Sequence, residues 1–559
     1  MIAALQPSIQ VSHLHTFFLF PFSINTDRVR AEHQQERKGA QHWLDAFQQW
    51  LLTCSTAHST ETQRLLGRWE RAPYREFSMD SRAYEDMVFF HPFVRHVFFD
   101  AEVPGQKEPS LSLLRCYRIP LQDREVYLNA KGGQDLRRVQ VTDLKLFIFA
   151  NGIGILSIGV EARNIPVETA LWVNEMLRKV YPSSGRQRRE GRAPGSVYMS
   201  VVRDGSEEIV AEEKFERGEM VDFEPPLSLL IRRLLYFLNY DQHEYEQVLD
   251  ERMIVYTYAD LDQESLPKGF IGAEDYEMLV SRFLYVDRYG PSYRYDPEFI
   301  LDSMDRQLYR RWAHEGTYYG ATSYSNISIT VGSGDRGGHS LSEGFLIHRM
   351  FRTRYYLMAI IALFYRATLL MFNERSALIS RDLYADQLRH EWTFTNIEKA
   401  QNLRGEFRHF TNYWFFQEVS NKDEESEHFD LQCREYRLDE MIGEISEELS
   451  AMSAAIGDFY QARNTFAVNR LAMLSLIFGA GAVFTGYFGM NFGRSFGSLF
   501  FDPKHPNTWV HTASIVLVTL FTIGAFAFGF YLIAANWSDY GKILRPKSGN
   551  GRKDGLSKR

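Results

Sequence analysis

The chain has very little cysteine. Cys54, Cys116 and Cys433 are the only three among 559 residues, and none forms a C-x-x-C pair. This excludes a disulfide framework and a cysteine-based zinc motif, and it is typical of proteins in a reducing compartment. An excess of basic residues is also missing. The formal net charge of −8 argues against nucleic acid as a main partner.

Motifs for nucleotide-driven chemistry are missing too. There is no G-x-x-x-x-G-K-[ST] sequence, and the sixteen histidines show no H-E-x-x-H or other metal-binding spacing. A G-x-G-x-x-G match at 332–337 precedes a long helical pattern instead of a returning strand, so we interpret it as a glycine loop and not a dinucleotide site. We therefore expect no enzyme and no organic cofactor.

What the chain does contain is a pair of long apolar runs near its C-terminal end. The first begins at Leu471, and its first twenty residues carry no charge. As a helix they would extend ~30 Å, the thickness of a bilayer's hydrocarbon core. The second run covers 510–536 and is uncharged unless His511 is protonated. We expect a transmembrane hairpin with spans at about 471–490 and 510–536, joined by an extracytoplasmic loop at 492–509.

The basic residues near these runs predict the orientation. Arg463 and Arg470 precede the first span, and the tail at 537–559 is rich in lysine and arginine, whereas the loop holds only Arg494 and Lys504. Cytoplasmic flanks of membrane helices carry the excess of positive charge. We expect a plasma (inner) membrane protein with two spans and both termini in the cytoplasm.

Residues 1–343 predict a cytoplasmic α/β domain. Asn151-Gly152 and Asp204-Gly205 each separate two β-like segments, which is the strongest short-range signal for a hairpin. The apolar run Phe17 to Ile24 is interpreted as a buried strand and not a signal peptide. A helical pattern at 167–180 completes the picture of a sheet covered by helices.

Residues 344–438 predict a helical segment. Tyr355 to Phe372 is apolar enough to resemble a span, but Arg366 lies inside it. We interpret it as a buried helix, with a third span as the alternative. The stretch 421–430 is interpreted as a polar, acidic connector.

A single long helix is predicted over 439–491, where a stalk continues into the first span. About fifty residues would reach ~75 Å, far more than a bilayer needs. Apolar residues at heptad spacing predict a packing seam on the stalk. These are Ile442, Ile445, Leu449, Met452, Ile456, Phe459 and Phe466.

A second stripe of the same helix is acidic, small or polar. Within the membrane part this stripe either packs closely against a neighbouring helix or lines a water-filled pore built by several copies, and we favour the pore. Val468 and Leu471 would form a hydrophobic constriction. The pore-lining candidates are Thr465, Val468, Leu471, Ser475, Gly479, Ala482 and Gly486.

The cytoplasmic part of the stripe is acidic. Its carboxylates either form a solvated face or line a vestibule that gathers or senses metal cations. We hypothesise that acids here bind intracellular metal cations and favour a closed state. The candidates are Glu440, Glu444, Glu447 and Asp458.

The first span ends in Tyr487-Phe488-Gly489-Met490-Asn491-Phe492. This resembles the Y-G-M-N-F sequence at the outer end of the penultimate span in the CorA family of divalent-cation channels, with Phe488 where the family has tyrosine. The resemblance implies a funnel-shaped homopentamer, Mg2+ as the transported and regulatory ion, and selectivity at Gly489, Met490 and Asn491.

The residues themselves support a ring of asparagines. Mg2+ gives up its waters reluctantly, and a neutral amide oxygen can accept hydrogen bonds from those waters without trapping the ion. The loop departs from the family, where it is often acidic, because it holds one acid, Asp502. Two alternatives stay open: a transporter of Zn2+ or another transition metal from the same family, and a membrane-anchored sensor or effector that uses the hairpin without Mg2+ selectivity.

Overall fold

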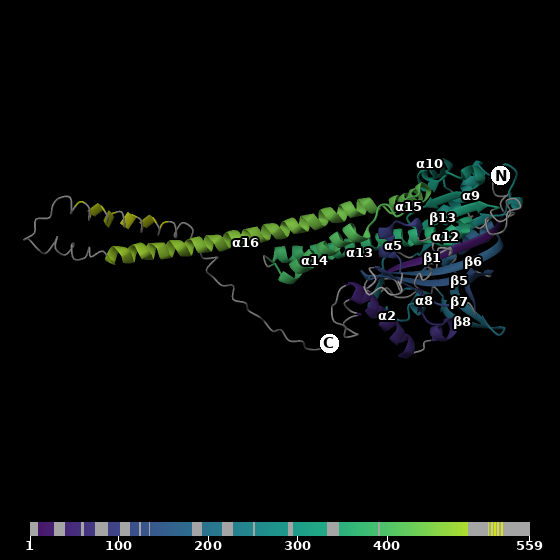
Figure 1. Ribbon diagram of the computed structural model, residues 1–559, viewed down its shortest axis with the longest axis horizontal. Coiled ribbons are helices and arrows are strands. Elements are labelled where there is room, and N and C mark those ends of the chain that lie inside the picture. Colours follow the sequence, from purple (N-terminus) through teal and green to yellow (C-terminus); the bar gives the residue numbers. More distant parts are fainter. Residues whose placement is uncertain are drawn as a thin grey trace, which may run out of the picture. The chain divides into compact units, whose positions relative to one another are not determined.

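The structure is a computed structural model that forms two compact units, Met1–Ser450 and Ala451–Arg559. Each unit is described by itself, and Figure 1 labels the elements. The residues that the structure describes are 9–26, 29, 40–57, 61–72, 88–100, 112–121, 124–132, 135–181, 193–214, 227–249, 252–288, 295–332, 346–389, 392–489 and single or paired positions between 513 and 531.

The first unit is built on one mixed sheet with β1 at its centre (Figure 1). Along the sheet the order is β11-β12-β13-β10-β1-β6-β5-β4-β7-β8, and β10 and β13 form a parallel pair. The strands found in the described residues are β1 Gln10–Ile24, β2 Glu70–Arg71, β3 Leu114–Arg118, β4 Glu125–Gly132, β5 Asp135–Phe149, β6 Ile153–Pro166, β7 Ser196–Arg203, β8 Ser206–Glu213, β9 Tyr245–Gln247, β10 Ile254–Leu261, β11 Leu308–Tyr309, β12 Tyr318–Ala321 and β13 Ser325–Val331.

Both predicted hairpins are confirmed. β5 and β6 pair antiparallel on either side of the turn at 150–152, and β7 and β8 do so around Asp204 and Gly205. Asp204 and Gly205 have φ values of 48° and 80°. A type I′ turn needs positive φ at both central residues, which is the reason that an Asp-Gly pair is found there.

The two faces of β1 are covered by different helices. Side chains of a strand alternate between the faces of a sheet. Thr16 donates a hydrogen bond of 2.8 Å to Asn174 on α6 (Val167–Leu177). The ring of Phe17 lies 4.6 Å from that of Tyr356 on α13 (Arg354–Leu388). Coverage on both faces explains why the strand reads as a continuous apolar run and confirms its prediction as a buried strand.

The helix α13 confirms the buried helix predicted at 355–372. By length and apolarity, Ile347–Leu388 is one of two candidate membrane spans among the described residues, yet 83% of its apolar window is buried. Phe364 stacks on Phe149 of β5 with ring centroids 4.0 Å apart. Arg366 donates to the carbonyl of Ser323 and lies over the ring of Tyr436, so its charge is accommodated within the protein.

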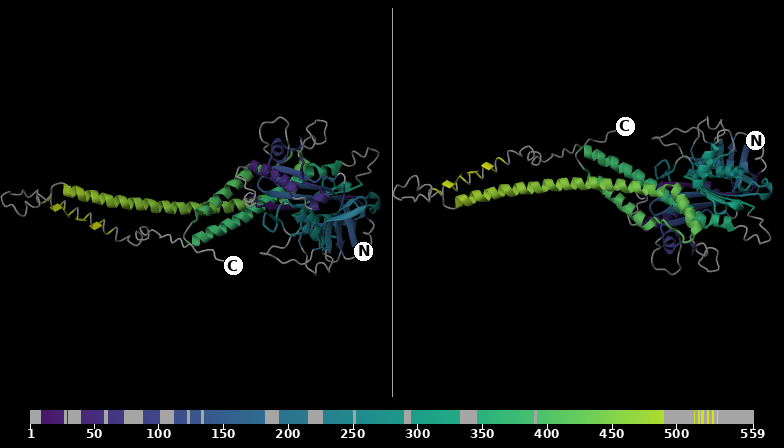
Figure 2. Two further views of the ribbon diagram at one scale, coloured as in Figure 1. Left: turned by 90° about the horizontal axis from the view of Figure 1, so that it is seen from below. Right: turned by 90° about the horizontal axis from the view of Figure 1, so that it is seen from above.

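Further helices surround the sheet, and Figure 2 shows α13 and α14 extending beyond it. The predicted connector at 421–430 is wrong, because most of it belongs to α15. Three acids, Asp423, Glu424 and Glu425, occupy the first turn of α15, where negative charge complements the helix dipole. The remaining helices are α2 Ala40–Ala57, α3 Glu61–Leu66, α5 Pro92–Phe98, α8 Leu229–Leu234, α9 Glu274–Tyr285, α10 Pro297–Gln307, α12 Leu346–Arg352, α14 Phe394–His409 and α15 Asp423–Glu435.

The long helix predicted over 439–491 is observed as α16, Leu438–Gly489, with 52 residues. Its apolar seam is buried at Ile445, Leu449, Met452 and Ile456, whereas Phe466 is 59% exposed. Ser376 of α13 donates a hydrogen bond of 2.7 Å to Glu448. The first turns of α16 therefore contact α13 within the first unit. Residues 438–483 are the second candidate span, with none of the apolar window buried.

The packing of α13 gives a first prediction. Phe364→Ala removes a fully buried ring that stacks on Phe149, and should cost about 3–5 kcal/mol of stability. Phe394→Ala on α14 is the matched control, because that ring is 72% exposed and its loss should cost under about 0.5 kcal/mol. Chemical unfolding of both variants, followed by tryptophan fluorescence, measures the difference. Equal unfolding midpoints would contradict the assignment of α13 as a core helix.

Candidate metal centre

Two histidines of β1 lie on the same face of the sheet. His13 and His15 are two residues apart, and a strand places such residues on one side. This is the face covered by α12 and α13, since Phe17, the next residue on it, contacts Phe351 and Tyr356. The exposed fractions of His13 and His15 are only 6% and 1%.

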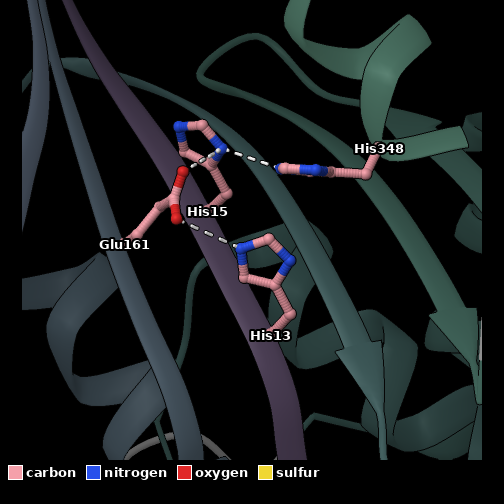
Figure 3. Close-up of side chains that lie close together, drawn as sticks. All are labelled: His13, His15, Glu161 and His348. Carbon is pink, nitrogen blue, oxygen red and sulfur yellow. Dashed lines mark hydrogen bonds and ion pairs between the residues drawn. The ribbon is translucent and has the colours of Figure 1, made fainter. Parts of the chain in front are cut away.

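A carboxylate stands beside these imidazoles because of strand register. Glu161 on β6 is the direct cross-strand partner of His15, and opposite residues of neighbouring strands share one face. Its Oε1 atom lies 3.2 Å from Nδ1 of His15, and its Oε2 atom lies 3.5 Å from Nε2 of His13. One acid therefore bridges both histidines, as Figure 3 shows.

The third histidine comes from a distant part of the sequence. His348 on α12 places its Nε2 atom 2.9 Å from Nδ1 of His15, across 333 residues of chain. Figure 3 shows its ring pointing from the helix toward the two strands. His13, His15, Glu161 and His348 each offer one ligand atom, and the four atoms lie within 4.8 Å of one another. We call these four residues the histidine cluster.

The protein interior sets the protonation of the cluster. Burial lowers the pKa of His15 well below its usual value and outweighs the opposing effect of Glu161. Burial, together with His13 and Arg352, lowers the pKa of His348 to about 3. Burial opposes ionisation of Glu161, but the surrounding histidines still bring its pKa to about 2. At neutral pH the carboxylate of Glu161 therefore lies beside the neutral imidazoles of His15 and His348.

Aromatic rings enclose the histidine cluster. Tyr258 of β10 lies 5.0 Å from the ring of His348, and Phe351 lies 5.7 Å from that of His15. Nε2 of His13 is buried and lies 3.5 Å from Oε2 of Glu161, which is longer than a good hydrogen bond. Imidazoles and a carboxylate that converge among buried aromatic side chains can hold a divalent metal ion.

Sequence reasoning missed this site. The prediction that the histidines show no metal-binding spacing is wrong for His13 and His15, which form an H-x-H pair on β1. An H-x-H pair within an apolar run is the one available signal, because alternation puts both rings on one face. Glu161 and His348 could not be assigned to it without the β1–β6 register and the docking of α12.

The predicted pore residues are only partly described. Thr465, Val468, Leu471, Ser475, Gly479, Ala482 and Gly486 all lie on α16 and are exposed in the single chain. Gly489 is the last residue of α16. Met490, Asn491, the loop at 492–509, the tail at 537–559 and most of the second predicted span lie outside the described residues.

The predicted acidic stripe is also exposed. Glu440 forms an ion pair with Arg437 at the start of α16, and Glu444, Glu447 and Asp458 follow along the helix. These four carboxylates do not converge on one point. In the described part of the chain, the group of side chains that does converge with metal-ligand geometry is the histidine cluster.

Comparison of the whole chain with protein-family models, curated proteins and solved structures gives no match.

The lowered pKa of His348 predicts how stability varies with pH in metal-free protein. The unfolded state, with a pKa near 6.5 for this group, takes up a proton before the folded state does. Folding stability should therefore fall as pH drops from 6.5 toward 3, and His348 alone accounts for about 2 kcal/mol between pH 7 and pH 5. Arg163, Arg352 and the rest of the cluster face the same group.

The measurement compares unfolding midpoints at pH 7 and pH 5 in a chelator. The wild type should lose more stability between these pH values than His348→Asn. His314→Asn replaces an exposed histidine and should keep the wild-type dependence. A wild-type slope in His348→Asn would show that His348 titrates as it does in the unfolded chain.

Proposed function

We propose that the chain is one subunit of a membrane channel that passes divalent metal cations, with Mg2+ as the first candidate cargo. The observation that carries this proposal is the uncovered apolar half of α16. Val468, Leu471, Phe478 and Val483 are 58–74% exposed. Monomeric soluble proteins rarely expose a continuous apolar surface of this kind, so lipid or further copies of the chain must cover it.

The arrangement of side chains around α16 supports a pore within an oligomer. Its small and polar positions, among them Ser475, Gly479 and Gly486, recur at alternating steps of four and three residues, while bulky residues such as Phe478 occupy other positions. A lone helix in lipid has no reason to separate small from large residues. Several copies of α16 around an axis would place the small stripe inward and the bulky residues toward lipid or the outer helix.

The sequence at the end of α16 supports a cation as the cargo. Gly489 ends the helix, and Met490 and Asn491 follow it. Asn491 repeated around an axis would give a ring of neutral amide oxygens that accept hydrogen bonds from the waters of hydrated Mg2+. A membrane potential of 100 mV, negative inside, supplies ~4.6 kcal/mol to a divalent cation, from ~2.3 kcal/mol per charge. Influx therefore needs no nucleotide.

A second cargo, Zn2+, is favoured by a separate observation. The histidine cluster offers three imidazoles and one carboxylate, a donor set that suits zinc and its neighbours and not Mg2+. A protein that handles Zn2+ would have use for such a site. The two cargoes are separated by measuring flux of both ions through the same protein.

The transport prediction is tested in liposomes that carry the purified protein. Asn491→Ala should lower Mg2+ uptake at least about tenfold, because hydrogen bonds to charged groups contribute roughly 1.5–3 kcal/mol each. Asn507→Ala is the matched control, since it makes the same change within the loop at 492–509 and should leave flux unchanged. Flux indifferent to Asn491 would overturn the selectivity ring.

The remaining outcomes separate the alternatives. Uptake of Zn2+ driven by a pH gradient, with little Mg2+ flux, would make the chain a transition-metal transporter. Absence of flux for both ions would favour a membrane-anchored sensor or effector.

The acidic stripe gives a further prediction about regulation. If Glu444, Glu447 and Asp458 bind internal Mg2+ in a closed channel, then neutralising all three (E444Q, E447Q, D458N) should leave flux high when internal Mg2+ is raised. Glu398→Gln changes an exposed acid of α14 and should retain inhibition by internal Mg2+. Inhibition that persists in the triple variant would mean that the stripe is only a solvated face.

A further inference from the structure

We infer that the histidine cluster is a binding site for one transition-metal dication of the Zn2+ type, and that the bound ion fastens α12 to the central strands of the sheet. The site lies within the first unit, and its occupation requires no pore. The inference therefore goes beyond the proposed transport function and does not depend on it.

The distances of the cluster fit a tetrahedral ion. Zinc bound to nitrogen and oxygen at 2.0–2.1 Å places neighbouring ligand atoms roughly 3.3 Å apart. Three of the separations here are 2.9 Å between Nδ1 of His15 and Nε2 of His348, 3.2 Å between Nδ1 of His15 and Oε1 of Glu161, and 3.5 Å between Nε2 of His13 and the other carboxylate oxygen, Oε2. All four ligand atoms lie within 4.8 Å of one another. Small side-chain rotations would close the wider gaps around a central ion.

The donor atoms determine which ion is bound. Three imidazole nitrogens and one carboxylate oxygen suit Zn2+, Co2+ and Ni2+. Mg2+ prefers six oxygen ligands in an octahedron and keeps several of its waters. The histidines of the cluster are at most 8% exposed, so an ion bound there would have to shed its waters, which Mg2+ does reluctantly. The site therefore selects against the cation proposed as the main cargo.

A purely structural network explains the cluster less well. Nε2 of His13 is buried and points toward the cluster, where Oε2 of Glu161 at 3.5 Å is too far for a good hydrogen bond. Buried polar atoms without partners are rare and need an explanation. Coordination to a metal would use this lone pair.

The ligands come from three separate elements. His13 and His15 belong to β1, Glu161 to β6 and His348 to α12. The helix α12 is short, with seven residues, and Thr353 separates it from α13 with non-helical dihedral angles. Besides His348, its Phe351 stacks on Tyr256 of the sheet at 4.3 Å. A metal at the cluster would add coordinate bonds between α12 and both strands.

The test uses full-length protein in detergent solution, from which bound metal ions have first been removed with a chelator. After dialysis against Zn2+ with a large excess of Mg2+, the wild type should retain about one zinc per chain in elemental analysis. His348→Ala and His13→Gln should each lower the retained zinc at least about tenfold, as loss of a ligand does. His314→Ala, an exposed histidine beside Glu315, should retain the wild-type amount.

Two measurements on the wild type keep the test valid if the variants fold poorly. Co2+ in the site should give the strong visible absorption of a tetrahedral ion, and Zn2+ should displace it. Zn2+ should also slow hydrogen exchange of the amides at 346–352 without a comparable effect at 274–285, the residues of α9. A wild type that retains no zinc, or variants that retain as much as it does, would overturn the site whatever the transport assay shows.

Discussion

The structure depends on the burial of β1 on both faces. A strand enclosed by α6 on one side and by α12 and α13 on the other can hold polar side chains only where they find partners. Thr16 meets Asn174 on the α6 face, and His15 meets Glu161 and His348 on the other. The histidine cluster is thus part of the centre of the sheet domain. Its geometry is determined by strand register and by the docking of α12, which surface loops would not fix as firmly.

Unlike β1, the helix α16 is buried only in its first part, and its later apolar side chains are exposed. Its first turns bury Ile445 and Leu449, so ordinary core packing accounts for this part. Among the described side chains from Phe466 onward, large apolar ones such as Leu471 and Phe478 are exposed. A helix cannot leave such a surface in water at a cost of roughly 25 cal/mol per Å2. The proposed membrane insertion rests on this change from a covered to an uncovered apolar face along α16.

The sequence predicted those features that depend on local chemistry. Asp204-Gly205 gave the correct turn because positive φ is a local requirement, and Arg366 identified α13 as a core helix because a charge is costly in lipid. The acids of 421–430 led to the wrong prediction of a connector, because negative charge favours the first turn of a helix as much as it favours a loop. His13 and His15 were visible as a pair, but Glu161 and His348 join them only through long-range pairing. Such pairing leaves no periodic trace in a single sequence.

Passage of Mg2+ through a pore and binding of Zn2+ at the histidine cluster, as proposed here, make different chemical demands and can occur in one chain. A permeation path for Mg2+ works by weak contacts with a hydrated ion, because an ion that sheds its waters and binds protein oxygens tightly would not leave. The histidine cluster has the opposite character, because its donors are mostly imidazole nitrogens and its histidines are buried. Mg2+ at high concentration would not compete for it, whereas Zn2+ at low concentration would occupy it. A chain with both could therefore conduct one cation and detect another without either ion interfering at the other's site.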